Sequence, residues 1–337
     1  MTEMTVLNGV AIEELLTIPM AVEAVEQAYL EKSKGDAALW PMVFHEFDPG
    51  HADLDIKSGD LGGLGFYGLK VVSWFGANPG KGLPALYGTS LLFDLATGAP
   101  RALLNAGPIT DFRTGAAGAI GAKYLARPDA ETLLMAGTGA LAPYLIAATL
   151  YLLPQIKTVY VTNPHHPECS AAACEAITPQ VEKLLSGCGG CHAAIAAAPD
   201  LEKAVRHSDV ILTATPAREP FIKAEWVQPG THISCVGADM PGKQEADSAL
   251  FASAKVFGDD TAQCLSVGEC EVPYKAGVFS GHICEIGGVI SGAEAGRTDA
   301  SDITIFDSTG IALQDIATAA ALLQAAQETG KGQTVTL

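Results

Sequence analysis

Residues 133–142 read LLMAGTGALA, and this stretch decides the fold. Its apolar first half is predicted to be a buried strand, and a helical pattern follows from Ala140 onward. Gly137 and Gly139 lie between the two, and glycine adopts backbone angles closed to other residues, so the chain can turn sharply there and approach a ligand. Ala142 stands at the third small position of the G-x-G-x-x-G/A pattern, which permits close helix–strand packing.

A helix that begins at such a turn presents free N–H groups and the positive end of its dipole to a pyrophosphate. A second strand-like run, 158–162, ends at Asn163, where dinucleotide-binding folds place their ribose-reading residue. In this context the pattern predicts a bound nicotinamide or flavin dinucleotide, and the alternative is an ordinary glycine-rich turn. The candidate cofactor-binding residues are Gly137, Thr138, Gly139, Ala140, Leu141, Asn163, His165 and Thr114.

Asn163 bears on the choice between NAD and NADP. An aspartate at this position would repel the 2′-phosphate of NADP, whereas asparagine does not. His165 and His166 follow closely and can donate hydrogen bonds to such a phosphate. We therefore favour NADP and keep NAD as the alternative.

Outside this stretch the chain shows two kinds of pattern. Residues 40–106 contain strand-like runs separated by turn signals, which predicts an antiparallel sheet or partial barrel. Later segments alternate strand and helix, which is typical of a doubly wound parallel sheet. We predict an α/β protein in which a Rossmann-type domain (119–304) is inserted into an α+β domain formed by 1–118 and 305–337.

Three helices outside the alternating region help to define the first domain. One is predicted over about 20–34, with Gly35 as its C-cap, and another, rich in Ala and Gly, over about 114–125. The last, 310–329, carries one apolar face. We expect this last helix to pack back on the N-terminal sheet.

Length, composition and charge limit the class of protein. A chain of 337 residues with 48% hydrophobic content is long enough for two domains. The formal net charge of -18 argues against nucleic acid as a partner. No apolar run approaches the ~20 residues that span a bilayer, and residues 1–4 resemble no export signal. We expect a cytoplasmic protein with no membrane partner, whose 8 cysteines are mostly free thiols.

Seven ordered stretches resemble the ornithine cyclodeaminase/mu-crystallin family. The resemblance implies a homodimer that binds a nicotinamide cofactor, with an N-terminal substrate-binding and dimerisation domain completed by the C-terminal helix. Members include amino-acid cyclodeaminases, amino-acid dehydrogenases and imine or ketimine reductases. The stretches are 68–73, 91–100, 110–117, 123–126, the glycine turn, 231–245 and 291–315.

Three cationic residues are candidates for substrate binding. Lys70 lies in an apolar run, so it needs an anionic partner or must reach water. Arg113 can grip a carboxylate through two parallel hydrogen bonds. The resemblance assigns both to the substrate α-carboxylate and gives Lys70 a catalytic part in polarising the C=N group; the alternatives are a solvent-facing lysine and a structural Arg113–Asp111 pair. Lys57 either meets a second substrate carboxylate or is a solvated strand lysine.

Asp239 is the second candidate catalytic residue. It lies in the pattern G-x-D-x-P-G-K-x-E at 237–245, after a predicted strand. The resemblance makes it the acid/base at the imine carbon, which requires that burial raise its pKa. The alternative is a loop aspartate before Pro241-Gly242.

Two features depart from the pattern of ornithine-specific enzymes. Residues 40–43 read WPMV, without the arginine that usually follows this proline, and Ala85 replaces a threonine. One carboxylate contact is therefore missing, which argues against ornithine itself; His45 and Lys57 are the candidate substitutes.

Cys188, Cys191 and His192 match the C-x-x-C-H spacing of haem attachment. Without an export signal we do not expect haem. A zinc site would need further ligands at suitable spacing. We therefore predict a surface turn with free thiols and no metal site.

The residues together predict hydride transfer between a nicotinamide and the α-carbon of an amino acid or its imine. Asp239 favours a cyclodeaminase, in which the cofactor is regenerated, whereas the missing arginine favours a reductase or dehydrogenase with net cofactor turnover. A crystallin-like protein that binds NADPH without turnover is the non-enzymatic alternative.

Overall fold

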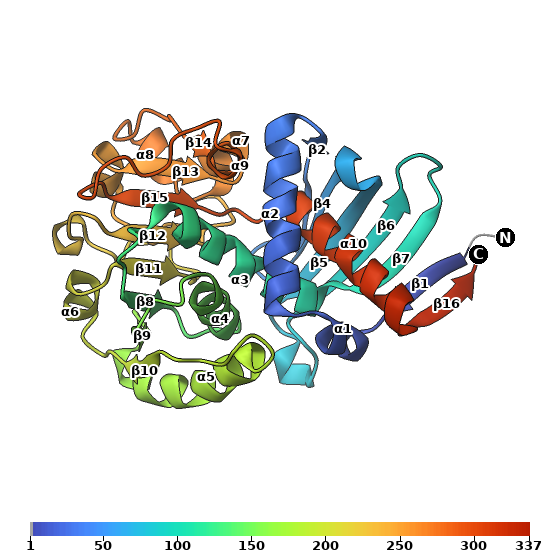
Figure 1. Ribbon diagram of the computed structural model, residues 1–337, viewed down its shortest axis with the longest axis horizontal. Helices are drawn as coiled ribbons and strands as arrows, with labels where there is room; N and C mark the ends of the chain where they lie inside the picture. Colours follow the sequence, from blue (N-terminus) through green and yellow to red (C-terminus); the bar gives the residue numbers. More distant parts are fainter. Residues whose placement is uncertain (1–2) are drawn as a thin grey trace. The chain divides into compact units, whose positions relative to one another are not determined.

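The computed structural model describes residues 3–337 and divides the chain into two units (Figure 1). Unit 1 comprises Met1–Arg113 and Ile311–Leu337, and unit 2 is Thr114–Gly310. The expected boundaries, 118/119 and 304/305, lie a few residues from these positions. Unit 2 is therefore an insertion into unit 1.

The sheet of unit 1 has eight strands in the order β16-β1-β7-β6-β5-β4-β2, with β3 also paired to β4. Within residues 40–106 the strands β3 to β7 pair antiparallel, which confirms the antiparallel sheet predicted there. The whole sheet is mixed, because β1 pairs in parallel with β7. The strands are β1 (Glu3–Leu7), β2 (Ala37–Leu39), β3 (Val43–Asp48), β4 (Ala52–Leu61), β5 (Phe66–Phe75), β6 (Leu86–Asp94), β7 (Pro100–Asn105) and β16 (Gln333–Thr336).

Unit 1 also contains helices α1 (Gly9–Leu15), α2 (Ile18–Lys34) and α10 (Ala312–Thr329). α10 packs on β4 and β5 and lies beside α2, as Figure 1 shows. The predicted packing of the last helix on the N-terminal sheet is therefore confirmed. Gly35 ends α2 in the left-handed conformation, with φ 79°, as expected for a C-cap glycine.

A pair of glycines lets α10 approach the sheet closely. Gly59 and Gly68 are direct partners across β4 and β5. A Cβ atom on Gly59 would lie 3.1 Å from the Leu313 side chain and 2.5 Å from a backbone oxygen. A Cβ on Gly68 would lie 3.3 Å from Ile316 and 2.7 Å from a backbone oxygen. Since neither position has room for a side chain, the first turns of α10 rest directly on the two strands.

The sheet of unit 2 has eight strands, all parallel, in the order β10-β9-β8-β11-β12-β15-β13-β14. The chain order reverses between β8 and β11, and such a switch point is where open α/β sheets bind ligands. The strands are β8 (Thr132–Ala136), β9 (Thr158–Thr162), β10 (Ala194–Ala197), β11 (Val210–Thr213), β12 (His232–Cys235), β13 (Lys255–Gly258), β14 (Cys284–Glu285) and β15 (Thr304–Asp307). The helices are α4 (Ala142–Leu152), α5 (Ser170–Leu185), α6 (Leu201–Arg206), α7 (Thr261–Val267), α8 (Glu271–Lys275) and α9 (Ile286–Ser291).

Helix α3 (Ala106–Leu125) begins earlier than the composition suggested. Asn105 accepts the N–H of Gly107 at 2.9 Å, and Pro108 lies in the first turn, where a missing N–H costs nothing. Arg113 therefore lies inside α3 and does not open it, which corrects the expected start at 114.

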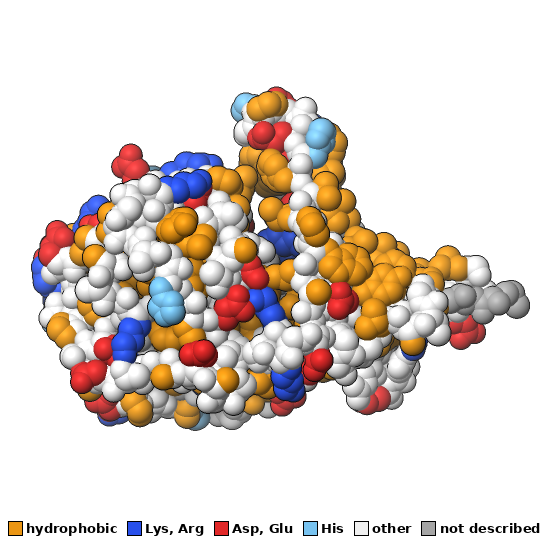
Figure 2. Space-filling model, turned by 90° about the horizontal axis from the view of Figure 1, so that it is seen from above, with side chains coloured by type: hydrophobic (Ala, Val, Ile, Leu, Met, Phe, Trp, Pro, Cys, Tyr) orange, Lys and Arg blue, Asp and Glu red, His pale blue; other side chains and the backbone are white. Residues whose placement is uncertain are grey.

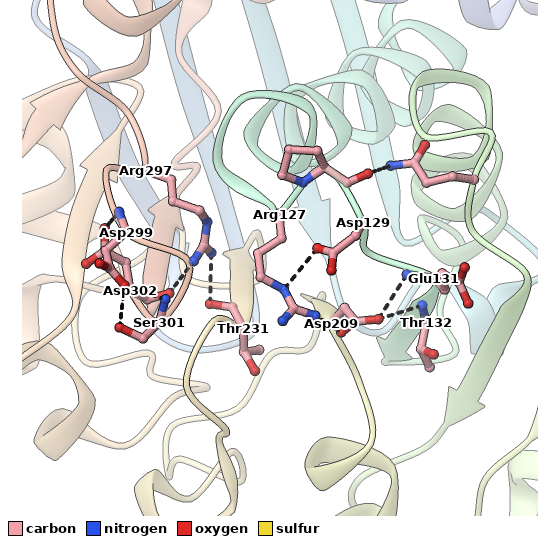
Figure 3. A network of polar contacts seen from close by, with 12 residues as sticks. Arg127, Asp129, Glu131, Thr132, Asp209, Thr231, Arg297, Asp299, Ser301 and Asp302 are labelled. Carbon is pink, nitrogen blue, oxygen red and sulfur yellow. Dashed lines mark hydrogen bonds and ion pairs between the residues drawn. The ribbon is translucent and has the colours of Figure 1, made fainter.

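Polar contacts close the amino-terminal edge of the parallel sheet (Figure 3). Arg127 contacts the Asp209 carboxylate at 2.5 Å. The other carboxylate oxygen accepts the N–H groups of Glu131 and Thr132, at the start of β8, at 2.9 and 3.0 Å. Arg297 donates to the backbone oxygen of Thr231, just before β12. Because these groups are engaged with each other, the edge is structural, and chemistry is expected at the carboxyl ends of the strands.

Large hydrophobic side chains are exposed on unit 1, and Figure 2 shows them as an orange area in its right-hand part. Large apolar side chains gathered on one exposed surface are typical of interaction sites. Among the described residues, no helix has the length and apolar character needed to cross a bilayer. The exposed side chains between β2 and the start of α3 are Trp40, Met42, Val43, Phe44, Phe47, Leu83, Leu86, Tyr87 and Leu95.

Candidate active site

Within unit 1, Lys70 and Arg113 converge on one carboxylate, that of Asp315. The Lys70 Nζ lies 3.0 Å from Oδ1 and 2.9 Å from Oδ2 of Asp315. The Arg113 Nε lies 3.3 Å from Oδ1. The side chains are 2%, 8% and 3% exposed, in the order Lys70, Arg113, Asp315. Lys70 is thus not a solvent-facing lysine. Arg113 forms an ion pair with Asp315 and also acts electrostatically on Asp111.

Neutral groups complete the surroundings of this triad. The Arg113 Nη1 donates to Gln314 Oε1 at 3.1 Å, and Gln314 in turn donates to the Tyr29 hydroxyl at 2.7 Å. Lys70 also donates to the Thr110 hydroxyl at 3.4 Å. Strand β5 and helices α2, α3 and α10 therefore hold the two cations in fixed positions.

The charges in this cluster perturb one another. Burial lowers the pKa of Lys70 to about 8; the attraction of Asp315 raises it, and the repulsion of Arg113 and Lys57 lowers it further. Burial raises the pKa of Asp315, but the attraction of Lys70 and Arg113 outweighs this and leaves the pKa below its usual value. A lysine with such a pKa can change its protonation near neutral pH.

Lys57 lies directly opposite Lys70 in the β4–β5 pair. It acts electrostatically on both Lys70 and Asp315. Directly opposed residues of an antiparallel pair project from the same face. The three predicted substrate-binding residues, Lys57, Lys70 and Arg113, are therefore brought together within unit 1.

Sequence reasoning missed Asp315. The signal was present, because this carboxylate lies in the first turn of a helix whose neighbours Leu313, Ile316 and Ala317 form an apolar face. An acidic residue on a buried helix face needs a cationic partner. The sequence pattern did not show which cation pairs with Asp315.

In unit 2, the glycine turn follows β8 as predicted. Gly137 has φ 129°, and a Cβ there would lie 2.5 Å from the backbone oxygen of Ala214. A Cβ on Gly139 would meet nothing within 4 Å, so this side of the turn is open. α4 begins at Ala142, and its N-cap residue Leu141 makes no side-chain hydrogen bond to the helix. The open turn and the uncapped helix start fit the pyrophosphate of a dinucleotide.

Asn163 connects the end of β9 to this turn. Its Nδ2 donates to the Thr138 hydroxyl at 3.0 Å. Its Oδ1 accepts the backbone N–H groups of His165 and His166 at 3.1 and 2.9 Å. The predicted residues of 137–141, 163 and 165 thus gather at the carboxyl ends of β8 and β9, whereas Thr114 is buried in α3.

Asp239 lies in the loop that follows β12, beyond the carboxyl end of the strand. Its side chain is 50% exposed, and the Lys243 Nζ lies 2.6 Å from Oδ1. The burial that was expected for an acid/base at this position is therefore not found, and the Asp239 carboxylate forms an ion pair with Lys243.

The loop at 237–245 is fixed by Glu245, a second residue whose role the sequence did not reveal. This fully buried carboxylate accepts the Thr213 hydroxyl at 2.6 Å and the N–H of Gly237 at 2.9 Å through Oε2. Oε1 accepts the N–H and the hydroxyl of Thr215 at 2.7 and 2.8 Å. Glu245 therefore joins the end of β11 to both ends of the loop that carries Asp239.

We expect Glu245→Gln to destabilise unit 2 by about 2–3 kcal/mol. An amide cannot accept all four hydrogen bonds, so at least one buried donor loses its partner. Urea unfolding measures the change. Glu271→Gln is the matched control, since Glu271 accepts a backbone bond from Gly242 in the same loop at 2.6 Å. An equal loss in both variants would contradict the assigned role of Glu245.

Cys188, Cys191 and His192 follow α5, and all eight cysteines are free. Across residues 3–337, no three side chains of His, Cys, Asp or Glu are arranged to hold a metal ion. Cys191 donates weakly to the Ala193 carbonyl at 3.7 Å. That this stretch holds no metal ion stays a prediction.

Comparison with known proteins gives matches over nearly the whole chain. Residues 2–330 match the model of the ornithine cyclodeaminase/mu-crystallin family. The chain is 36% identical to alanine dehydrogenase of Archaeoglobus fulgidus, over 94% of this chain and 93% of that protein. Among solved structures, an archaeal alanine dehydrogenase dimer with bound NAD has a TM-score of 0.86 at 36% identity, with 99% of each chain covered. Iminosuccinate reductase of Paracoccus denitrificans in complex with NAD+ has a TM-score of 0.89 at 31% identity, with 99% and 100% covered.

Proposed function

The chain belongs to the ornithine cyclodeaminase/mu-crystallin family, and we propose that it interconverts an α-amino acid and its 2-imino acid with net turnover of a nicotinamide cofactor. As a member of this family it is an NAD(P)-dependent enzyme that acts at the C–N group of an amino acid or imine. Relatives that are a dehydrogenase and a reductase, matched over nearly their whole length, support net turnover.

One observation carries the proposal, namely the two buried cations Lys70 and Arg113 side by side in unit 1. An α-carboxylate is common to every amino and imino acid, and a guanidinium with an ammonium fixes both its charge and its orientation. Unit 2 supplies the open glycine turn for the cofactor. Unit 1 thus holds the candidate substrate-binding residues, and unit 2 holds the candidate cofactor-binding turn.

In the oxidative direction the α-carbon loses a hydride and the nitrogen loses a proton, which leaves the imine. When bound, the nicotinamide supplies the acceptor for that hydride, and in the reverse direction the donor. Lys70 and Arg113 hold the carboxylate, and the charge of Lys70 polarises the adjacent C=N group. We assign the proton transfer at nitrogen to Asp239, whose carboxylate accepts it in one direction and returns it in the other.

The test is an assay of NAD(P)H absorbance with L-alanine, L-aspartate and L-proline, and in reverse with the corresponding 2-oxo acid plus ammonium or the cyclic imine. We expect absorbance to change in proportion to product. Ammonium release from a diamino acid without any absorbance change would instead identify a cyclodeaminase, the second candidate, which Asp239 in its family pattern favours. Tight NADPH binding without turnover of any substrate would identify a binding protein.

The choice between NAD and NADP is tested at Asn163. We expect Asn163→Asp to lower kcat/KM for NADPH relative to NADH by about tenfold or more, because a carboxylate repels the 2′-phosphate. Thr138→Val is the matched control, since it removes the bond to Asn163 without adding charge and should affect both cofactors equally. The NAD and NADH held by solved relatives support NAD(H) use by the wild type, whereas the NADP preference inferred from Asn163 remains a prediction.

We also propose that the chain forms a homodimer through the exposed hydrophobic area of unit 1. An alanine dehydrogenase relative is a dimer, and exposed residues such as Phe44 and Phe47 are otherwise costly in water. Light scattering should give twice the chain mass of 34.8 kDa. A monomer at micromolar concentration would contradict this.

The proposed location is the cytoplasm. All eight cysteines are free thiols in the structure, as is usual in a reducing compartment. Cell fractionation that places the protein in an oxidising compartment would contradict the assignment.

A further inference from the structure

Among residues 3–337, Asp315 is the carboxylate that contacts both cations of the proposed substrate site. We propose that Asp315 is a positioning residue, which holds the Lys70 ammonium and the Arg113 guanidinium together as a single binding site for the substrate carboxylate. This inference rests on the proposed function, because the pair has a ligand only if the substrate is an amino or imino acid.

The first argument is electrostatic. Two like charges, each more than nine-tenths buried, repel one another and lose hydration when they are brought together. Asp315 lies 2.9 Å from one and 3.3 Å from the other, and so offsets both costs at once. Removing one member of such a buried group leaves an uncompensated charge.

The second argument concerns how helix α10 positions Asp315. It lies in the first turn of α10, where the helix dipole favours a negative charge. The glycine pair Gly59 and Gly68 lets that turn rest on β4 and β5, and the next pair on the same face is Lys57 and Lys70. The position of α10 on the two strands therefore sets the distance from the Asp315 carboxylate to Lys70 and Arg113.

The third argument concerns the remaining charge. The groups that act on Lys70 and Asp315 are Lys57 from β4 and Arg113 from α3. Arg113 also acts on Asp111 of α3, whose pKa burial raises to about 6. Glu13 acts on Asp111 in turn. Three cations, Lys57, Lys70 and Arg113, act on Asp315, so the immediate surroundings of this carboxylate stay positive for an anionic ligand.

A competing interpretation predicts the opposite sign. If Asp315 merely occupied the cations in place of the substrate, its removal would free them and tighten binding. If Asp315 positions the cations and keeps Lys70 charged, its removal weakens binding. The KM for the amino or imino acid therefore distinguishes the two.

The test compares Asp315→Asn with the wild type and with Asp111→Asn, which removes a carboxylate near Arg113 but not beside Lys70. In protein labelled with 13C at lysine Cε, we expect Asp315→Asn to lower the pKa of Lys70 by about 1–3 units, since an attracting charge within 4–6 Å is lost. The resonance is assigned by its absence in Lys70→Arg. Asp111→Asn should leave this pKa in place or lower it only slightly, because Asp111 is not among the groups that act on Lys70.

In steady state, Asp315→Asn should raise the KM of the carboxylate substrate about tenfold, with a smaller change in kcat, and move the alkaline limb of kcat/KM to lower pH. Asp315→Glu, which keeps the charge, should restore the limb. An unchanged Lys70 pKa, or a lower KM in Asp315→Asn, would overturn the proposal.

The NMR titration separates this inference from the proposed function, because it needs no turnover. If the wild-type protein is inactive on every amino and imino acid, the proposed function is refuted. The titration of Lys70 still decides the role of Asp315 in that case. NADH binding by unit 2 serves as the check that each variant is folded. If Asp315→Asn fails that check, Asp315→Glu carries the test, and a Lys70 pKa that moves by more than about 1 unit despite the retained charge would contradict the proposal.

Discussion

Asp239→Asn is expected to lower kcat by about 10²–10⁴-fold with little change in NADH binding, since a positioned acid/base contributes a factor of this size. The substitution keeps the shape of the side chain and removes its ability to accept a proton. Stopped-flow measurement of the hydride step in H2O and in D2O shows whether the decrease in kcat arises in the chemical step or in product release.

The matched control for Asp239 is Lys243→Gln, which breaks the 2.6 Å ion pair but keeps the carboxylate. We expect this variant to lose no more than about tenfold, because an exposed ion pair contributes little. Equal losses in the two variants would show that the pair orders the loop, and that Asp239 does not move the proton. Activity of Asp239→Asn within a few-fold of the wild type would remove Asp239 from the mechanism altogether.

Lys70→Met is expected to lower kcat/KM by about 10³-fold. Loss of a charge-assisted hydrogen bond to the substrate carboxylate costs about 1.5–3 kcal/mol, or 10–150-fold, and loss of the charge that polarises the C=N group reduces kcat as well. Methionine fills the same volume, so Asp315 keeps Arg113 as its partner. The measurement is a full set of steady-state constants, with NADH affinity as the check on folding.

Lys57→Met is the matched control, because it removes the same charge from the directly opposite strand position. If Lys57 binds a distal carboxylate, its loss should affect a dicarboxylic substrate such as L-aspartate at least about tenfold more than L-alanine. Equal effects on both substrates would show that Lys57 makes the site more positive without contacting a distal carboxylate. A loss of activity in Lys57→Met as large as that in Lys70→Met would contradict the assignment of Lys70 as the principal contact.

The pKa of Lys70 also sets an expected pH dependence. Because burial lowers this pKa to about 8, the charged form that binds a carboxylate is lost as the pH rises through that value. The KM should therefore increase above pH 8 in the wild type. This loss of binding forms the alkaline limb of the pH profile of kcat/KM, which Asp315→Asn is expected to move to lower pH.

Local pattern was sufficient for the parts of the fold that depend on neighbours in the chain. The glycine turn at 137–142 between two strands predicted the dinucleotide-binding topology, and the strand order around β8 agrees with it. The apolar face of 310–329 predicted the packing of α10 on the first sheet. These predictions hold because backbone freedom and side-chain periodicity act over only a few residues.

The same local reasoning failed where a single contact outweighs propensity. The Ala and Gly content suggested a helix start at 114, but Asn105 and Pro108 allow α3 to begin at Ala106. The parallel pairing of β1 with β7 was also missed, because nothing in either strand records the direction of a partner about a hundred residues away.

By itself, the sequence determined the two-part architecture, the family resemblance, and the identity of Lys70, Arg113 and Asp239 as candidates. Only the tertiary structure decided that Asp315, 245 residues from Lys70 along the chain, is the carboxylate both cations share. It likewise decided that Lys57 lies opposite Lys70, and that Glu245 fixes the loop of Asp239. The physical reason is that a buried charge requires a partner, but strand register and helix packing choose which residue supplies it.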